Sequence, residues 1–431
     1  MYYNEKIEKM PRSQLEVLQG ERLKKLAVYA YERIPFYREK MDAIKLKPSD
    51  IKTIYDIVKL PFTEKTDLRD HYPYKMFAVP KKDVVRVHAS SGTTGRLTVV
   101  GYTKNDLDNW AEAMARSLTI AGVTDESTVH VAYGYGMFTG GFGVHYGAEK
   151  IGARVVPMSS GNTARQLLLL RDFEATTLCC TPSYAAFLAE SLKTQGYNIK
   201  DFNLKSGVFG AEPWSEGMRS FIQDSLEIRA YDIYGLSEIT GPGVSMECNQ
   251  LSGLHVWEDM FYPEIIQEDL TSAAAGAQGE LVFTTLVKEA LPLIRYRTRD
   301  LCSLDTTVCK CGRTHVRMGK IVGRSDDMLI VRGVNVFPSQ IETALLDLGY
   351  TGPNYRLIVG RTENTDHLDV EIELLPQMFS DEVRKIEKIR EEIVRRIFAV
   401  TGLKVGVRFV EIGTIPRSEG KAQRVVDHRK I

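Results

Sequence analysis

The sequence Ser90-Ser91-Gly92-Thr93-Thr94-Gly95-Arg96 lies between two runs rich in β-branched residues, at positions 84–89 and 97–102. Both runs are typical of β-strands. The glycines allow positive φ and close approach to a ligand, while the hydroxyls and backbone N–H groups are donors that suit an oxyanion. The stretch therefore predicts a phosphate-binding loop between two strands.

The same loop also has a simpler interpretation. Clusters of Ser, Thr and Gly are commonly plain hairpin turns. The Gly-Lys-Ser/Thr ending and the directly following helix of a P-loop are both missing. The loop alone therefore leaves phosphate binding and a plain turn open.

Length, charge and hydropathy limit the possible functions. The chain has 431 residues, enough for roughly two to three domains. Lys and Arg together number 56, as do Asp and Glu, so the overall charge does not indicate a nucleic-acid partner. Apolar runs are far shorter than the roughly 20 residues that cross a bilayer, and residues 1–6 do not resemble a signal peptide. We expect a cytoplasmic protein with neither nucleic-acid nor membrane partners.

Helix and strand patterns alternate after the loop. Thr103 is a natural N-cap with Asp106 three positions later, and apolar residues then recur at helical spacing as far as Gly122. Alternating strands and helices predict βαβ units, and therefore an α/β fold with a parallel or mixed sheet flanked by helices. The predicted strands are 128–133, 154–157, 176–180, 208–210 and 228–233, and the predicted helices are 140–150, 163–172, 183–193 and 216–225.

The two ends of the chain have different patterns. Residues 13–33 predict an amphipathic helix, which we assign to a helical cap over residues 1–60. After residue 325, strands, a short helix and a long charged helix follow one another. We therefore predict a large N-terminal domain over residues 1–325 and a small α+β domain over residues 326–431.

Glycine-containing segments follow three of the predicted strands, at residues 133–141, 209–213 and 231–238. Ligands of such sheets lie beyond the carboxyl ends of the strands. We expect the three segments to face one cleft.

The order of these motifs resembles the adenylate-forming superfamily of acyl-CoA synthetases, luciferases and peptide-synthetase adenylation domains. The resemblance is closest to the bacterial phenylacetate–coenzyme A ligase family and covers essentially the whole chain. It rests on the number, order and spacing of the motifs. Besides the loop, they are Tyr133-Gly134-Tyr135-Gly136-Met137-Phe138-Thr139-Gly140-Gly141, Thr181-Pro182-Ser183-Tyr184, Glu247-Cys248, Gly253-Leu254-His255, Arg295-Tyr296-Arg297-Thr298-Arg299-Asp300, Gly323-Arg324-Ser325-Asp326-Asp327 and Pro416-Arg417-Ser418-Glu419-Gly420-Lys421.

The resemblance implies an enzyme that joins an acid to AMP from ATP, releases pyrophosphate, and passes the acyl group to coenzyme A. The order is chemically sensible, because a thiol cannot usefully expel oxide from a carboxylate whereas AMP is a good leaving group. Charge gathers on the phosphates in the first step, so Mg²⁺ and a positioned cation are required.

Residue roles follow from the same resemblance. Lys421 matches the lysine that stabilises the adenylation transition state, Glu238 the acid that holds Mg²⁺, and Thr94 a phosphate-gripping hydroxyl. Asp300 matches the acid that receives the ribose hydroxyls, and Arg324 an arginine near ribose and phosphate. The other implied nucleotide-binding residues are Ser90, Ser91, Gly92, Thr93, Gly95, Ala211, Glu212, Pro213, Asp232, Tyr234, Gly235 and Ser237.

The small domain is expected to move. Asp326 matches the hinge of the family, about which this domain would rotate to insert and then withdraw Lys421.

Taken without the resemblance, Asp300 could be an ordinary member of a surface ion pair and Lys421 a solvated lysine.

The cysteines indicate a metal site. Six cysteines are too few for a disulfide scaffold, and Cys-x-Cys pairs are common zinc ligands, although free cysteines in a loop are the alternative. The family resemblance favours a closed, structural zinc site that does no chemistry. The predicted ligands are Cys248, His255, Cys309 and Cys311, and the competing candidates are Cys302 and His315.

The acid pocket is predicted to be aromatic and apolar. Tyr135, Phe138, Gly210 and Ile233 lie in segments expected to line the cleft opposite the nucleotide, where core packing is the alternative role for the aromatic rings. Because no Lys or Arg occurs in those segments, we expect phenylacetate or a close arylacetate such as indole-3-acetate.

Two other functions remain open. One is an adenylyltransferase that stops at the AMP adduct or passes it to an acceptor other than coenzyme A. The other is a regulatory protein that uses nucleotide occupancy as a signal, which the presence of Glu238, Asp300 and Lys421 disfavours. The resemblance also suggests a homodimer.

Overall fold

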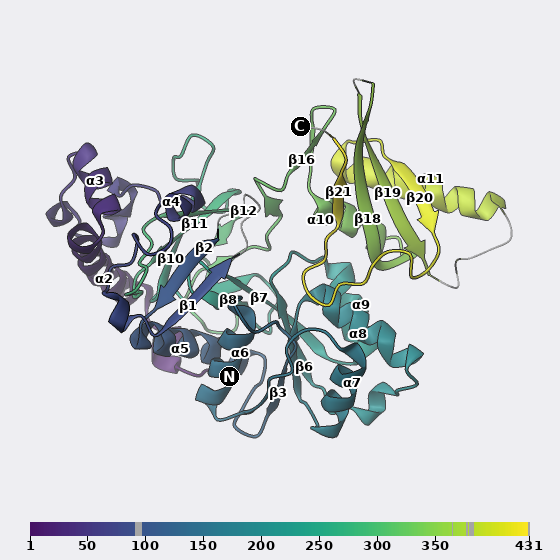
Figure 1. The fold of residues 1–431 in the computed structure, drawn as a ribbon, viewed down its shortest axis with the longest axis horizontal. Coiled ribbons are helices and arrows are strands. Elements are labelled where there is room, and N and C mark those ends of the chain that lie inside the picture. The colour runs from purple at the N-terminus through teal and green to yellow at the C-terminus, as the bar shows by residue number, and fades with distance from the viewer. Residues whose placement is uncertain (91–96, 364, 376–377, 379–382, 430–431) are drawn as a thin grey trace.

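The computed structural model describes residues 1–90, 97–363, 365–375, 378 and 383–429. Its chain forms a large N-terminal domain and a small C-terminal domain, which lies at the upper right of Figure 1. The N-terminal helices lie on the far side of the large domain from the small one. Within the described ranges, no helix combines the length and the apolar character needed to cross a membrane.

A nine-stranded mixed sheet is the centre of the large domain, in the order β13-β14-β9-β8-β7-β6-β5-β3-β4. Strands β7, β6, β5, β3 and β4 run parallel to one another, and the other neighbours are antiparallel. The predicted α/β fold is confirmed. The strands are β3 (Thr128–Val131), β4 (Arg154–Val156), β5 (Thr177–Cys180), β6 (Ser206–Gly210), β7 (Arg229–Leu236), β8 (Gly241–Glu247), β9 (Leu254–Val256), β13 (Leu304–Asp305) and β14 (Arg317–Met318).

Helices cover this sheet and form the N-terminal cap. The predicted N-cap is confirmed: Thr103 Oγ1 accepts a hydrogen bond from the Asp106 N–H at 3.1 Å, and Asp106 Oδ2 accepts one from the Thr103 N–H at 2.9 Å. The α-helices are α1 (Glu5–Glu8), α2 (Arg12–Arg33), α3 (Pro35–Ala43), α4 (Lys65–Asp70), α5 (Lys104–Ile120), α6 (Gly140–Ile151), α7 (Thr163–Asp172), α8 (Pro182–Thr194) and α9 (Glu216–Leu226).

Helix α4 is an element that the sequence analysis did not identify. The Asp67 carboxylate accepts a hydrogen bond from the Glu64 N–H at 2.7 Å, and this bond caps the first turn of the helix. A helix of this length has too few residues for a periodic pattern to be visible in the sequence.

A second, antiparallel sheet and a hairpin complete the large domain. The sheet has the order β10-β11-β12-β15, and β1 pairs with β2 so that Ser90 lies opposite Thr98. The two strands predicted beside the loop are therefore confirmed, whereas loop residues 91–96 lie outside the described residues. These strands are β1 (Arg86–Ser90), β2 (Thr98–Tyr102), β10 (Phe261–Ile266), β11 (Gly279–Thr285), β12 (Tyr296–Cys302) and β15 (Gly323–Arg324).

The small domain has its own hydrophobic core between a four-stranded sheet and two helices. The sheet order is β20-β19-β18-β21, and a hairpin of β16 and β17 precedes it. Its elements are β16 (Leu329–Val331), β17 (Val334–Val336), α10 (Pro338–Leu346), β18 (Thr351–Thr362), β19 (Thr365–Leu374), α11 (Val383–Thr401), β20 (Gly406–Val410) and β21 (Val425–Asp427).

Two glycines of α6 let this helix pack closely on α5. A Cβ at Gly143 would lie 2.7 Å from the ring of Trp110, and a Cβ at Gly147 would lie 2.4 Å from the Cβ of Met114 and 2.9 Å from its backbone carbon. No side chain fits at either position without moving α5. The contact matters for the site, because the segment that precedes α6 is one of the three glycine-containing segments.

We expect Gly147→Ala to destabilise the protein by about 1–3 kcal/mol, because its methyl group would overlap backbone that cannot turn aside. The measurement is the midpoint of thermal unfolding, followed by circular dichroism. Gly352→Ala is the control, because the nearest atom to its new methyl lies 3.9 Å away. Equal losses in the two variants would contradict the packing argument.

Candidate active site

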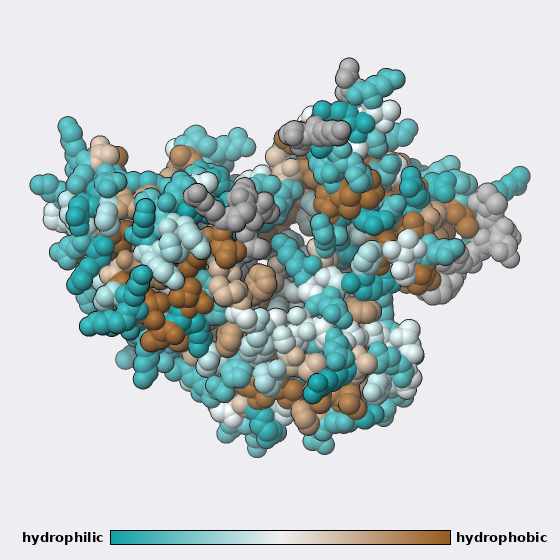
Figure 2. All heavy atoms as spheres, viewed as in Figure 1, coloured by the Kyte–Doolittle hydropathy of each residue, from teal (hydrophilic) through white to brown (hydrophobic). Residues whose placement is uncertain are grey.

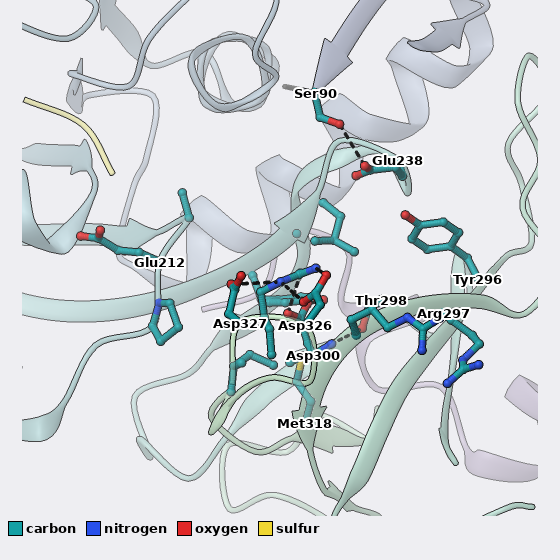
Figure 3. A pocket seen from close by; sticks show the side chains of 18 of the residues that line it. Ser90, Glu212, Glu238, Tyr296, Arg297, Thr298, Asp300, Met318, Asp326 and Asp327 are labelled. Atoms are coloured by element: carbon teal, nitrogen blue, oxygen red, sulfur yellow. Dashed lines mark hydrogen bonds and ion pairs between the residues drawn. The ribbon is translucent and has the colours of Figure 1, made fainter. Parts of the chain in front are cut away.

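A cavity of about 650 Å³ lies where the large domain faces the small one. Segments at the carboxyl ends of β6 and β7 line it, together with β12, β15 and α4. Lys421 reaches it from the small domain. Figure 2 shows a recess between the two domains, and Figure 3 shows the cavity from close by. The cavity thus lies at the sheet edge where ligands of α/β proteins are found.

Asp300 is the centre of a hydrogen-bonded cluster in this cavity. Its Oδ2 accepts a bond from the Tyr234 hydroxyl at 2.6 Å, and its Oδ1 accepts one from Arg324 at 3.0 Å. Arg324 lies directly opposite Asp300 in the β12–β15 ladder and also donates to Asp326 at 3.0 Å. Burial raises the pKa of Asp300, and the Arg324 charge opposes this shift. Three residues that the sequence placed in the site therefore meet, and the predicted hinge residue Asp326 is bonded to them.

Glu238 lies at a different place in the cavity, as Figure 3 shows. The carboxylate is buried, and its Oε1 accepts a hydrogen bond from the Ser90 hydroxyl at 3.0 Å. Lys65 of α4 forms an ion pair with the same oxygen at 3.2 Å. A buried carboxylate facing a cavity is a suitable ligand for Mg²⁺, which prefers a few hard oxygen ligands.

The sequence analysis missed Lys65, which lines the cavity, and Lys288, which supports the segment that carries Glu238. The buried Lys288 ammonium donates to the backbone oxygens of Glu238 at 3.2 Å and Ile239 at 2.8 Å, and burial lowers its pKa to about 8. These bonds hold the backbone that carries Glu238. Lys288 lies between β11 and β12, where no motif or periodicity singles it out, and Lys65 lies in the unexpected helix α4.

The turn after β6 presents Glu212 to two partners. A Cβ on Gly210 would lie 2.1 Å from the backbone oxygen of Ile233, so no side chain fits there. Ala211 has φ +72°, a conformation that costs a non-glycine residue about 1–2 kcal/mol. Glu212 then accepts hydrogen bonds from the N–H groups of Ser183 and Ala422, each at 2.8 Å.

The predicted acid-pocket residues do not all lie at this cavity. Ile233 lines it, whereas Tyr135, Phe138 and Gly210 do not. The Tyr135 hydroxyl instead lies 3.2 Å from His145 Nδ1, and Phe138 is 57% exposed. The sequence placed these residues in or after the correct strands, but it does not show which of them face the cavity.

The other predicted residues are distributed as follows. Asp232 lines the cavity, and burial, reinforced by the nearby Glu247 charge, raises its pKa to about 7. Ser237 does not line the cavity, and its hydroxyl lies 3.1 Å from that of Thr139. The predicted nucleotide-binding residues that do line it are Ser90, Ala211, Glu212, Pro213, Asp232, Tyr234, Gly235, Glu238, Asp300 and Arg324, and those outside the described residues are Ser91, Gly92, Thr93, Thr94 and Gly95.

The predicted metal ligands converge at a separate place. One ligand atom from each of Cys248, His255, Cys309 and Cys311 lies within 4.8 Å of the others. Cys302 is not part of this group. His315, the other competing candidate, has both ring nitrogens within 3.0 Å of backbone groups.

Comparison with known proteins supports a nucleotide site. The family model for AMP-binding enzymes matches residues 23–285, and that for the AMP-binding enzyme C-terminal domain matches residues 333–429. The phenylacetate-coenzyme A ligase of Escherichia coli is 51% identical, over 99% of this chain and 97% of the relative. The corresponding ligase of Thermus thermophilus is 48% identical over the whole of both chains.

Solved structures agree on the fold and distinguish two domain arrangements. Those of 2-hydroxyisobutyryl-CoA ligase are 30% identical to this chain and cover 98% to 99% of it, while the match covers 92% of that ligase. The TM-score is 0.93 for its postadenylation state with 2-HIB-AMP and 0.74 for its thioesterification state with CoA. Since identity and coverage are nearly the same, the two scores show that the overall arrangement of this chain is more similar to the first of these structures than to the second. With relatives about half identical over nearly full length, the chain belongs to the phenylacetate-coenzyme A ligase family of AMP-binding enzymes.

Proposed function

We propose that this acid–thiol ligase uses phenylacetate, or a close arylacetate such as indole-3-acetate, as its acid. The relatives that match nearly the whole chain are phenylacetate-coenzyme A ligases. The observation that carries the assignment of the site is that Glu238, Asp300 and Lys421 line one cavity although they are far apart in the sequence. A transition state with charged phosphates requires a metal ligand, a nucleotide anchor and a cation in one place.

In the proposed reaction, Asp300 receives the ribose hydroxyls of ATP and Ser90 helps to bind the phosphates. Glu238 would hold Mg²⁺, which supplies charge neutralisation at the phosphates when bound. The acid carboxylate attacks the α-phosphorus, pyrophosphate leaves, and Lys421 stabilises the charge that develops. The coenzyme A thiol then attacks the carbonyl carbon, and AMP leaves with the bonding electrons.

We further propose that residues 326–431 are a mobile domain with its hinge at Asp326. This position lies between β15, the last strand of the large domain, and β16, the first strand of the small one. Arg324 forms hydrogen bonds with both Asp326 and Asp300, so the proposed hinge is bonded to the residue proposed to receive the ribose hydroxyls.

We also propose that the protein is a homodimer in the cytoplasm. Light scattering in solution tests the oligomeric state.

The cluster of Cys248, His255, Cys309 and Cys311 is proposed to bind a structural Zn²⁺. Three sulfurs and one imidazole are donors that Zn²⁺ favours, and four protein ligands leave no open position for chemistry. Cys248 Sγ lies 3.7 Å from Cys309 Sγ, and Cys311 Sγ lies 3.3 Å from His255 Nε2. Separations of this size are compatible with the edges of a tetrahedral site.

Lys421→Ala should lower the rate of adenylation by about 10²- to 10³-fold, because it removes a cation from a charged transition state. The measurement is single-turnover pyrophosphate release with an arylacetate. The rate of thioester formation from pre-made acyl-AMP should change little. Lys388→Ala, at an exposed position on α11, is the control. Comparable losses in both half-reactions would contradict the proposed role.

Coenzyme A ligation with ATP and Mg²⁺ should be faster with arylacetates than with straight-chain fatty acids. A panel of acids, each assayed with and without coenzyme A, provides the measurement. An AMP adduct that accumulates and is never passed to coenzyme A would favour an adenylyltransferase. No preference for arylacetates over fatty acids would refute the proposed acid.

Protein purified without chelator should contain about one zinc per chain, and Cys311→Ser should remove most of it and lower the unfolding temperature. Elemental analysis gives the metal content. Cys302→Ser should retain the zinc, because Cys302 lies outside the cluster. Absence of zinc from the unaltered protein would end this hypothesis.

A further inference from the structure

The backbone on either side of Lys421 is held by the large domain. The Thr181 hydroxyl donates to the backbone oxygen of Gly420 at 2.9 Å. On the other side, the N–H of Ala422 donates to Glu212 Oε2 at 2.8 Å. Both neighbours of the proposed catalytic lysine are thus bonded across the domain boundary, and we call these two bonds the lysine clamp.

We propose that Thr181 and Glu212 are positioning residues for the adenylation half-reaction. They would fix the backbone at Lys421 so that its ammonium reaches the phosphates, and they would release it before thioester formation. The proposal rests on the proposed function, because it gives Lys421 a task in one half-reaction only.

The fold fixes the direction of the Thr181 hydroxyl. Thr181 follows β5 and is the N-cap of α8, where its Oγ1 accepts a hydrogen bond from the Tyr184 N–H at 3.3 Å. That bond uses a lone pair of the oxygen and leaves the hydroxyl hydrogen for another partner. The side chain is buried, and the partner it meets is Gly420 O.

Glu212 is fixed in a comparable way. Its Oε1 accepts the bond from Ser183 in the first turn of α8, where the positive end of the helix dipole favours a carboxylate. Oε2 is then directed at Ala422. Ala211, with its positive φ, precedes Glu212 in this turn. Figure 3 shows Glu212 apart from the group around Asp300. Glu212 therefore connects α8 to residues 420–422, which we call the lysine loop.

Other contacts hold the small domain itself, so the lysine clamp has a separate task. Glu190, also on α8, accepts bonds from Arg417 at 3.0 Å and Asn354 at 2.7 Å. The Ser215 N–H donates to Glu342 of α10 at 3.1 Å. Substitution of Thr181 leaves these contacts in place. Loss of its hydroxyl should therefore misplace residues 420–422 without separating the small domain from the large one.

Thr181→Val should lower the single-turnover rate of adenylation about tenfold, because a neutral hydrogen bond to the loop is lost. The rate of thioester formation from pre-made phenylacetyl-AMP and coenzyme A should stay within about twofold. Thr181→Ser keeps the hydroxyl and should restore most of the adenylation rate. Thr194→Val is the matched control, because it removes a hydroxyl at the other end of α8 that bonds only within the helix, to Ser191 O at 3.1 Å.

A second measurement separates positioning from a loss of folding. In the Lys421→Ala background, Thr181→Val should cause little further loss of adenylation, because Thr181 acts through the lysine. Unfolding temperatures of the Thr181 variants show whether the fold is intact.

These measurements can give three distinguishable results. If Thr181→Val slows both half-reactions equally, or adds its full effect to that of Lys421→Ala, the lysine clamp is overturned. If the unaltered protein adenylates arylacetates and Thr181→Val matches it, the clamp fails while the proposed function stands. If the unaltered protein forms no adenylate with any acid, both are overturned.

Discussion

A single buried carboxylate connects the parts of this protein that must cooperate. Asp300 accepts a bond from Tyr234 of the central sheet and one from Arg324 of β15. Its own strand, β12, belongs to the second sheet. An isolated buried carboxylate would be costly, so the two donors are required for the fold as well as suited to a ligand site. Through Arg324, the same cluster extends to Asp326, where the chain enters the small domain.

Carboxylates make several of the contacts across the boundary between the domains. Glu342 of the small domain accepts a bond from Ser215, the N-cap of α9, and Glu212, which is held at the start of α8, accepts one from Ala422. Free N–H groups are present at any helix start, so such contacts need no reshaping of the backbone. Burial raises the pKa of Glu342, which indicates that leaving water costs this charge free energy.

Local patterns foretold the parallel half of the central sheet but neither its antiparallel half nor the strands of the second sheet. Residues 128–233 alternate regularly between apolar strands and capped helices, and these signals are local. In β12, by contrast, Arg297 and Arg299 alternate with buried residues and pair with Glu64 and Glu280. A strand that presents arginines on one face lacks the apolar composition by which strands are recognised, because its partners come from distant segments.

The same distinction applies to the site. Motif order foretold which segments line the cavity, and Asp300, Tyr234 and Arg324 do meet. It did not foretell that Tyr135 turns toward His145, because side-chain direction in a loop depends on contacts made by the whole fold. Lys288 was missed for a related reason: its partners are backbone oxygens of the Glu238 segment, which no composition reveals.

The strength of the lysine clamp has to meet two opposing demands. In the proposed reaction, Lys421 is placed closely for one step, and the loop that carries it leaves before the next. One clamp bond joins a hydroxyl to a carbonyl, and the other joins a backbone amide to a carboxylate. Bonds exchanged against water contribute only about 0.5–1.5 kcal/mol each when neutral and about 1.5–3 kcal/mol when one group is charged. Two bonds of this strength can order a short loop and can still be exchanged for bonds to water when the loop leaves.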